Sequence, residues 1–194
     1  MQNSDGAADH YFVIKSKGSG RMMLWNPSDG VGDASWTSGN LFRQAPPQPV
    51  LMQILAGYEQ DELPDFKLTP TVMSSALHDV LVKAGVDNID VYDAIIASED
   101  GSVRHAGFKA YNLIGVVSAT DFATTVFSPS NPSRVIDASI DSLAIDVKKV
   151  TGVLMFRLAE NTGVILVHRR VKEALEAANF ESLYFMAPGE LLTL

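Results

Sequence analysis

The sequence contains no cysteine, and none of its apolar runs is long. Without cysteine there can be no disulfide, no thiolate metal ligand and no cysteine nucleophile. No stretch reaches the roughly eighteen apolar residues that mark a transmembrane helix. The first residues, MQNSDGAADH, lack the basic and apolar parts of a secretion signal, which favours a cytoplasmic protein.

Motifs that bind nucleotides or carry nucleophilic catalysis are also missing. There is no Gly-x-Ser-x-Gly elbow, no phosphate-binding P-loop and no Gly-x-Gly-x-x-Gly. The glycines of SKGSGRM (16–22) precede an expected strand rather than a helix, so they indicate a hairpin turn. Asp87, Asp90 and Asp93 recur at every third position of an expected strand, so their side chains alternate between faces and cannot share one metal. We therefore expect no cofactor and no metal site.

The histidines offer one catalytic alternative. None of the four stands in a His-x-x-x-His or His-x-Glu pattern. His105 is close in sequence to Glu99 and Asp100, and a carboxylate–histidine pair could serve a small hydrolase or transferase. Such neighbours usually belong to the surface of a hairpin, so a non-enzymatic protein is the favoured interpretation.

Negative charge is in excess, and the excess lies in one segment. The 194 residues are 46% hydrophobic and 20% charged, which is typical of a globular domain, and the net charge is −8. Residues 57–100 hold ten acidic and two basic side chains, whereas residues 1–56 and 101–194 are each neutral. The charge argues against nucleic acid as a partner. A field concentrated in this way would steer a basic protein to one face, although it could also be a solvated acidic surface.

Apolar patterning predicts strands over much of the chain. YFVIKS (11–16) is expected to pair with RMMLW (21–25) in a hairpin, and a loop and a stiff connector follow. Further strands are expected at 49–57, 88–97, 103–118, 133–137, 142–146, 152–158 and 163–167. The strand at 103–118 contains KAYNLIGVV, whose apolar run suits a central strand that is covered on both faces or packed against helices.

Two amphipathic helices are expected. In LTPTVMSSALHDVLVKAG (68–85), Thr69 fits the N-cap, Pro70 the first helical position and Gly85 the residue just past the end. The second helix is RRVKEALEAANF (169–180).

The two helical regions resemble each other. Residues 68–77 align with 166–175, and residues 85–91 align with 179–185, if the second helix is four residues shorter. This favours two copies of a strand–helix–strand unit. The alternative is the general likeness of amphipathic helices that end in a small residue.

Several segments resemble a bacterial immunity-protein family of polymorphic toxin and contact-dependent systems, typified by a myxobacterial protein. The resemblance lies in FKAYNLIGVV (108–117), LAID (143–146), LMFRL (154–158) and ILVHRRVKEALEAANFESLYF (165–185). The segment GYEQDELPDF (57–66) also suits the first half of the family. The resemblance covers residues 104–191 well and 50–100 loosely, and residues 17–48 have no counterpart.

The resemblance implies a protein that binds and neutralises a cognate toxin encoded beside it and is not itself an enzyme. It implies no shared binding residues, because each member fits its own toxin. An acidic surface suits a basic toxin such as a nuclease. The predicted toxin-binding residues are therefore Tyr58, Asp61, Glu62, Asp65, Asp87, Asp90, Tyr92, Asp93, Glu99 and Asp100, with the two tyrosines as aromatic anchors.

The sequence as a whole predicts a single α+β domain with a mixed or mainly antiparallel sheet and two main helices. Its parts are an N-terminal hairpin and loop region (10–48), a first strand–helix–strand unit (49–100) and a second half (101–194). Neither a membrane nor a nucleic acid is expected as a partner. A structural module that pairs with itself through an exposed strand edge is a further alternative, which makes a homodimer possible.

Overall fold

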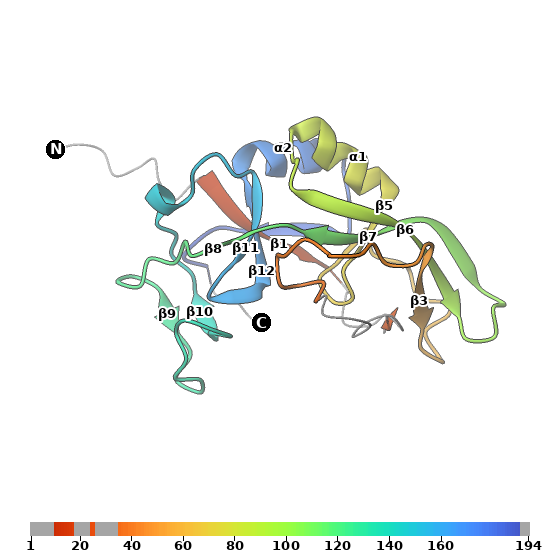
Figure 1. Ribbon diagram of the computed structural model, residues 1–194. Helices are drawn as coiled ribbons and strands as arrows, with labels where there is room; N and C mark the ends of the chain where they lie inside the picture. The colour runs from red at the N-terminus through yellow and green to blue at the C-terminus, as the bar shows by residue number, and fades with distance from the viewer. Residues whose placement is uncertain (1–9, 18–23, 26–34, 191–194) are drawn as a thin grey trace.

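Two mixed β-sheets lie side by side, and two helices pack on the same side of both (Figure 1). The structure is a computed structural model and describes residues 10–17, 24–25 and 35–190. The helices are α1 (Ser75–Ala84) and α2 (Arg169–Ala177). The predicted α+β class with mixed sheets is confirmed.

The first sheet has six strands in the order β2-β3-β6-β7-β5-β4. These are β2 (Leu24–Trp25), β3 (Val50–Ile54), β4 (Phe66–Lys67), β5 (Val72–Ser74), β6 (Ile89–Ser98) and β7 (Arg104–Leu113).

The second sheet has five strands in the order β13-β1-β12-β11-β8. These are β1 (Tyr11–Ser16), β8 (Val116–Val117), β11 (Met155–Leu158), β12 (Asn161–His168) and β13 (Leu183–Met186). A separate ribbon of β9 (Val126–Phe127) and β10 (Ile140–Ser142) lies below it in Figure 1, and a 3-10 helix (Val147–Lys149) follows β10 in the chain.

The run KAYNLIGVV connects the two sheets. β7 ends at Leu113 in the first sheet, and β8 pairs in parallel with β11 in the second. Gly115 stands between them with a φ of 92°, a left-handed conformation that glycine adopts without steric cost. The single strand predicted at 103–118 is therefore wrong, because this segment forms two strands in different sheets.

The predicted N-terminal hairpin is also wrong. β1 pairs with β12 and β13, whereas β2 pairs with β3 in the other sheet. The turn predicted between them, at residues 18–20, lies outside the described residues. Pairing with strands distant in sequence, rather than the local turn signal, determines the partners of β1.

The first helix begins later than its Thr69-Pro70 signal predicted. Ser74 is the N-cap, and its side chain accepts a hydrogen bond from the Leu77 backbone NH. The preceding residues belong to β5, which pairs with both β4 and β7. The predicted stop at Gly85 is confirmed, since this residue is left-handed with a φ of 97°.

Most other predicted strands are present with shifted ends. The prediction at 133–137 is wrong, because residues 134–137 form bends. The strand predicted at 142–146 is β10, which ends at Ser142, and Ile145 forms only an isolated bridge with Thr120. The strand predicted at 152–158 begins at Met155.

The two sheets contain the same structural unit. In each unit a hairpin leads into a helix, and the chain then returns as a strand parallel to the second hairpin strand. A further strand, antiparallel to both, lies between them. The first unit consists of β4, β5, α1, β6 and β7, and the second consists of β11, β12, α2, β13 and β1.

The two units match position by position, at one constant spacing from the N-cap to the following strand. The matched pairs are Ser74 and His168 at the N-caps, Leu77 and Val171, Leu81 and Leu175 at buried helix positions, Gly85 and Asn179 with positive φ, and Ile89 and Leu183 at the next strand. The duplicated unit therefore holds, but the predicted four-residue shortening of the second helix is wrong. Leu77 corresponds to Val171 rather than to Leu175.

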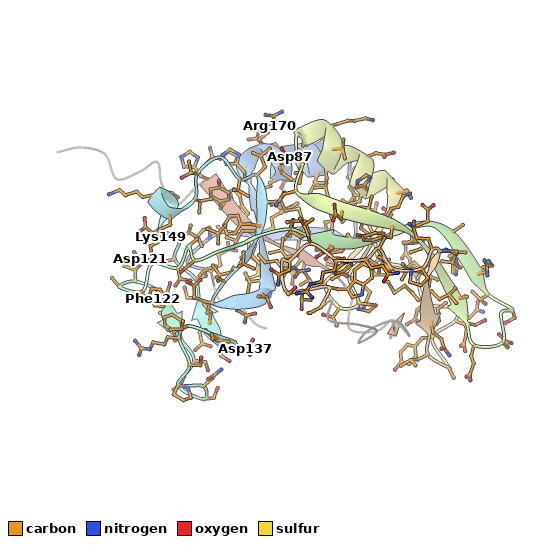
Figure 2. All side chains as sticks on the ribbon, viewed as in Figure 1. Asp87, Asp121, Phe122, Asp137, Lys149 and Arg170 are labelled. Carbon is orange, nitrogen blue, oxygen red and sulfur yellow. The ribbon has the colours of Figure 1, made fainter. Side chains whose placement is uncertain are left out.

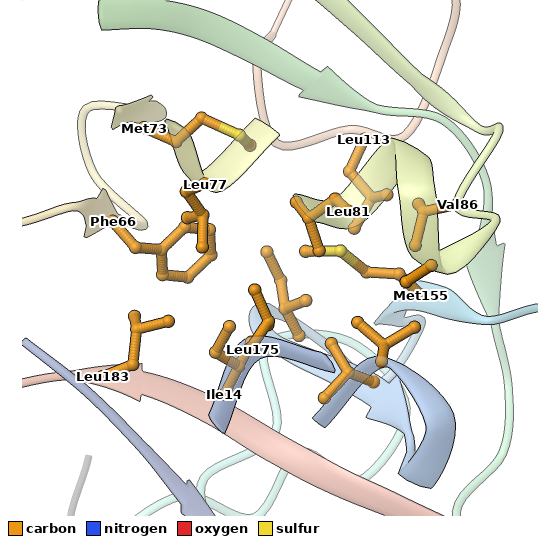
Figure 3. Close-up of a cluster of buried hydrophobic side chains, with 14 of the residues drawn as sticks. Ile14, Phe66, Met73, Leu77, Leu81, Val86, Leu113, Met155, Leu175 and Leu183 are labelled. Carbon is orange, nitrogen blue, oxygen red and sulfur yellow. The ribbon is translucent and has the colours of Figure 1, made fainter. Parts of the chain in front are cut away.

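One hydrophobic core lies between the helices and the sheets, and both units contribute to it (Figure 3). Ten of its fully or nearly fully buried members are Ile14, Phe66, Met73, Leu77, Leu81, Val86, Leu113, Met155, Leu175 and Leu183. Because apolar area from both units is buried in one place, we expect the units to unfold together.

Each sheet has a second, separate core on its opposite face. The segments 35–49 and 55–63, on either side of β3, cover the first sheet around Trp36, Met52 and Ile96. The segment 117–153 covers the second sheet around Phe156. These covering segments are the parts in which the two units differ most.

Reciprocal hydrogen bonds link the two units at matched positions. The Asn88 amide donates to the carbonyls of Ile114 at 2.8 Å and of Met155, in the second unit, at 2.9 Å. Its counterpart Ser182 donates from Oγ to the Asp65 carboxylate at 2.8 Å, and Oγ accepts from the Asp65 backbone NH at 3.2 Å. In each unit, the residue just before the strand that follows the helix is thus hydrogen-bonded to the segment where the other unit's hairpin begins.

A fully buried arginine also lies between the units. Arg157 donates from Nη1 to the Thr162 carbonyl at 2.7 Å, while its Nε and Nη2 have no hydrogen-bond partner among the described residues. Burial lowers the pKa of Arg157, and the adjacent Tyr111 opposes this shift. Burial also raises the pKa of Tyr111, whose hydroxyl donates to the Lys67 carbonyl at 3.0 Å. Tyr111 is therefore neutral and supplies no counter-charge.

Candidate interaction site

The first unit carries an extension that the second lacks. We call it the arm, and it comprises residues 50–63 and 93–109, which include β3 and the outer part of the β6–β7 hairpin. In the second unit, the corresponding strand β13 ends at Met186 and its neighbour β1 begins at Tyr11. The arm extends past the helices to one side of the molecule (Figure 1).

Two acidic segments meet at the far end of the arm. β3 and β6 run in parallel with Ile54 opposite Ser98, so the loop after β3 and the turn after β6 leave the sheet at the same end. We call this region the acidic tip, and it contains Glu59, Asp61, Glu62, Glu99 and Asp100. Four of the predicted binding residues thus lie in two loops that leave the sheet at the same end.

Asp100 stabilises the turn of the tip. Its carboxylate accepts hydrogen bonds from the Ser98 hydroxyl at 2.6 Å, the Ser102 backbone NH at 3.0 Å and the Ser102 hydroxyl at 2.8 Å. These bonds, that of Ser98 first, lower the pKa of Asp100 to about 2. A carboxylate with so low a pKa is a weak base, so it is poorly suited to take a proton from a substrate near neutral pH.

The two predicted aromatic anchors are partly buried. Tyr92 packs edge-on against Trp36 and stacks with Phe42, with ring centroids 5.7 and 5.8 Å apart. Burial, and next the nearby Asp90, raises the pKa of Tyr92. Tyr58 also packs against the core beneath this sheet. Both tyrosines hold the covering segment in place rather than standing free.

The other predicted acidic residues lie apart from the tip. Asp65 is engaged by Ser182, and Asp87 lies at the helix side of the molecule (Figure 2). Asp90 and Asp93 project from opposite faces of β6, and Asp93 forms an ion pair with Lys109 at 2.5 Å. The ten predicted residues therefore do not form one continuous face.

The arm also presents a sheet face that none of the described residues covers, which we call the uncovered face and which the sequence did not reveal. Leu51 lies beside Ile95, and Gln53 lies beside Ala97, on the side opposite Trp36. Leu51 is 50% exposed, and neither it nor Ile95 packs against any of the three cores. On the side opposite Trp36, VLMQI presents one apolar and one polar residue, Leu51 and Gln53, whereas the other side is wholly apolar.

The catalytic and metal-binding alternatives gain no geometric support. His105 lies opposite Ile96 in the ladder, while Asp100 is occupied by Ser98 and Ser102. In the part of the chain that the structure describes, no group of three or more metal-ligating side chains could hold an ion. Neither described helix is long and apolar enough to cross a membrane.

No family model matches the sequence, and no curated protein matches it. The resemblance to the immunity-protein family therefore stays a prediction.

Proposed function

We propose that the protein is an immunity protein that binds and neutralises a basic bacterial toxin. The observation that carries this proposal is the arm, which places five carboxylates at the end of an extension that the repeated fold does not require. A part of a molecule that is absent from an otherwise equivalent unit is a natural place for a specific function.

Charge supports a basic partner. The second unit and its covering segment are balanced overall, whereas the excess negative charge falls within residues 57–100. Grouped carboxylates accelerate association with a cationic surface and disfavour acidic competitors. A toxin that acts on nucleic acid has such a surface, because it must bind phosphates.

The function can be tested by co-expression with the C-terminal domain of the toxin encoded by the adjacent gene. The protein should restore growth, and the purified pair should bind more weakly at high salt than at low salt. Failure of the wild-type protein both to protect cells and to bind would refute the immunity function for this neighbour.

The acidic tip can be tested separately by charge reversal. Combining Asp61→Lys, Glu62→Lys and Glu99→Lys should weaken binding by at least about tenfold at low salt. A control variant with Asp141→Lys, Glu173→Lys and Glu181→Lys changes the net charge equally but lies outside the arm. Equal loss of affinity in the two variants would show that only net charge matters and would remove the tip from the binding site.

A further inference from the structure

The uncovered face of the arm is apolar at its centre. Leu51 and Ile95 lie side by side on adjacent strands, and Ala97 follows on the same face of β6. Sheets normally bury an apolar face against another layer of structure. An exposed apolar face surrounded by polar groups is typical of a protein-binding surface.

The face is uncovered because the helices do not extend over the arm. α1 packs against β5, β7 and α2, which together belong to the shared core. A Cβ added at Gly107 in the outer part of β7 would meet no atom within 4 Å, so the space around this position is open. Leu51 is half exposed on the face, while Ile95 and Ala97 are partly buried, so an approaching molecule can reach it.

Polar groups surround this apolar centre. The ion pair between Asp93 and Lys109 lies on one side, and Gln53 lies towards the end that bears the acidic tip. Arg104 stands opposite Ala97 on β7. If an apolar segment of a partner protein contacted Leu51 and Ile95, basic residues of the partner beside that segment would thus lie within reach of the acidic tip.

The face alone is too small for a stable complex with any protein partner. Three strands about 4.8 Å apart, with about five residues of 3.4 Å each, cover only about 240 Å². A stable complex buries about 800 Å² on each partner. The occupant must therefore also contact neighbouring parts of the arm, where the excess of carboxylates favours a basic protein.

We propose that this uncovered face is the docking platform for the toxin, with an apolar segment of the toxin on Leu51, Ile95 and Ala97 and its basic residues at the acidic tip. The proposal rests on the immunity function and adds the apolar contact that fixes the orientation of the bound toxin. Apolar contacts at the centre of an interface, surrounded by polar ones, usually dominate the affinity.

The test compares two pairs of substitutions to lysine. Leu51→Lys with Ala97→Lys places cations on the platform, where they would repel a basic toxin. Val82→Lys with Val135→Lys introduces the same charge at positions that are 54% and 68% exposed and lie outside the arm. Affinity for the neighbouring toxin domain is measured for both variants, and thermal unfolding checks that each is folded.

Binding should weaken at least thirtyfold in the platform variant and less than threefold in the control. A milder variant, Leu51→Ser with Ala97→Ser, should lose affinity even at high salt, where charge effects are screened. Equal binding by wild-type and both platform variants would overturn the docking platform and leave the immunity function intact. If the wild-type protein neither binds nor protects, both proposals fall together.

Discussion

The first and second units share a skeleton but differ in how they are completed. The first is continuous from β4 to β7, whereas the second takes its central strand, β1, from the other end of the chain. Matched positions keep burial rather than identity, since Phe66 corresponds to Met155 and Tyr111 to Ile14. The comparison separates what the fold needs, which both units have, from the arm, which only one has.

The largest effect is expected from matched truncations in the shared core. Leu81→Ala in α1 and Leu175→Ala in α2 should each lower the free energy of unfolding by about 2–5 kcal/mol, because each leaves a cavity among fully packed side chains. Urea denaturation followed by circular dichroism and by fluorescence measures the loss.

Both variants should unfold in a single transition, like the wild-type protein, because the core belongs to both units. Two separated transitions in either variant would show that the units are independently stable, which a shared core does not allow.

A smaller effect is expected at Arg157, whose matched position in the first unit is Leu68. A buried charge without a counter-charge contributes little or negative net stability, so Arg157→Leu should stay within about 1 kcal/mol of wild type. Arg157→Ala should lose about 2–4 kcal/mol because it also leaves a cavity.

Chemical denaturation distinguishes these two outcomes. If Arg157→Leu were as destabilising as Arg157→Ala, the guanidinium itself would be required, and the match with Leu68 would not extend to this site.

The smallest effect is expected at the ends of the two helices. Gly85→Ala should cost about 1 kcal/mol, because alanine is strained at positive φ. Asn179→Gly should change stability by only about 0.5 kcal/mol, because asparagine already tolerates this conformation. Thermal unfolding of both variants would measure the difference in stability. If Asn179→Gly were as destabilising as Gly85→Ala, the two helix ends would not share the left-handed conformation that makes them equivalent.

Local signals predicted much of the fold. The end of α1 at Gly85, the turn at 98–102 and the helix α2 all depend on residues close together in sequence. The start of α1 was mispredicted because Thr69-Pro70 imitates a helix start, while pairing with β7 holds Val72–Ser74 in a strand. No local pattern reports a strand partner that lies elsewhere in the chain.

Long-range pairing explains the other differences. The partners of β1 follow it by about 150 to 170 residues, so the nearby Gly-rich segment suggested the wrong hairpin. The two units were misaligned by matching Ala76-Leu77 with Ala174-Leu175, whereas the buried positions set the correct register. Residue identity was a poorer guide to the alignment of the two units than burial.

For the candidate site, the sequence predicted which segment is acidic but not how its residues are arranged. Counting charges located the acidic segment, but the pairing of β3 with β6 decides which carboxylates meet at the tip. Tyr92 was predicted as a free anchor, and only the structure shows that Trp36 and Phe42 surround it. The uncovered face depends on where the helices end, which no property of Leu51 or Ile95 discloses.

The position of β1 has a consequence for the order in which the protein is made. A ribosome releases β1 long before β12 and β13, so this strand must wait while the whole first unit emerges. The first unit can form its own ladder from β4 to β7 during that interval. It can then offer its half of the shared core to the second unit, and we expect β1 to pair with β12 and β13 only after those strands have emerged.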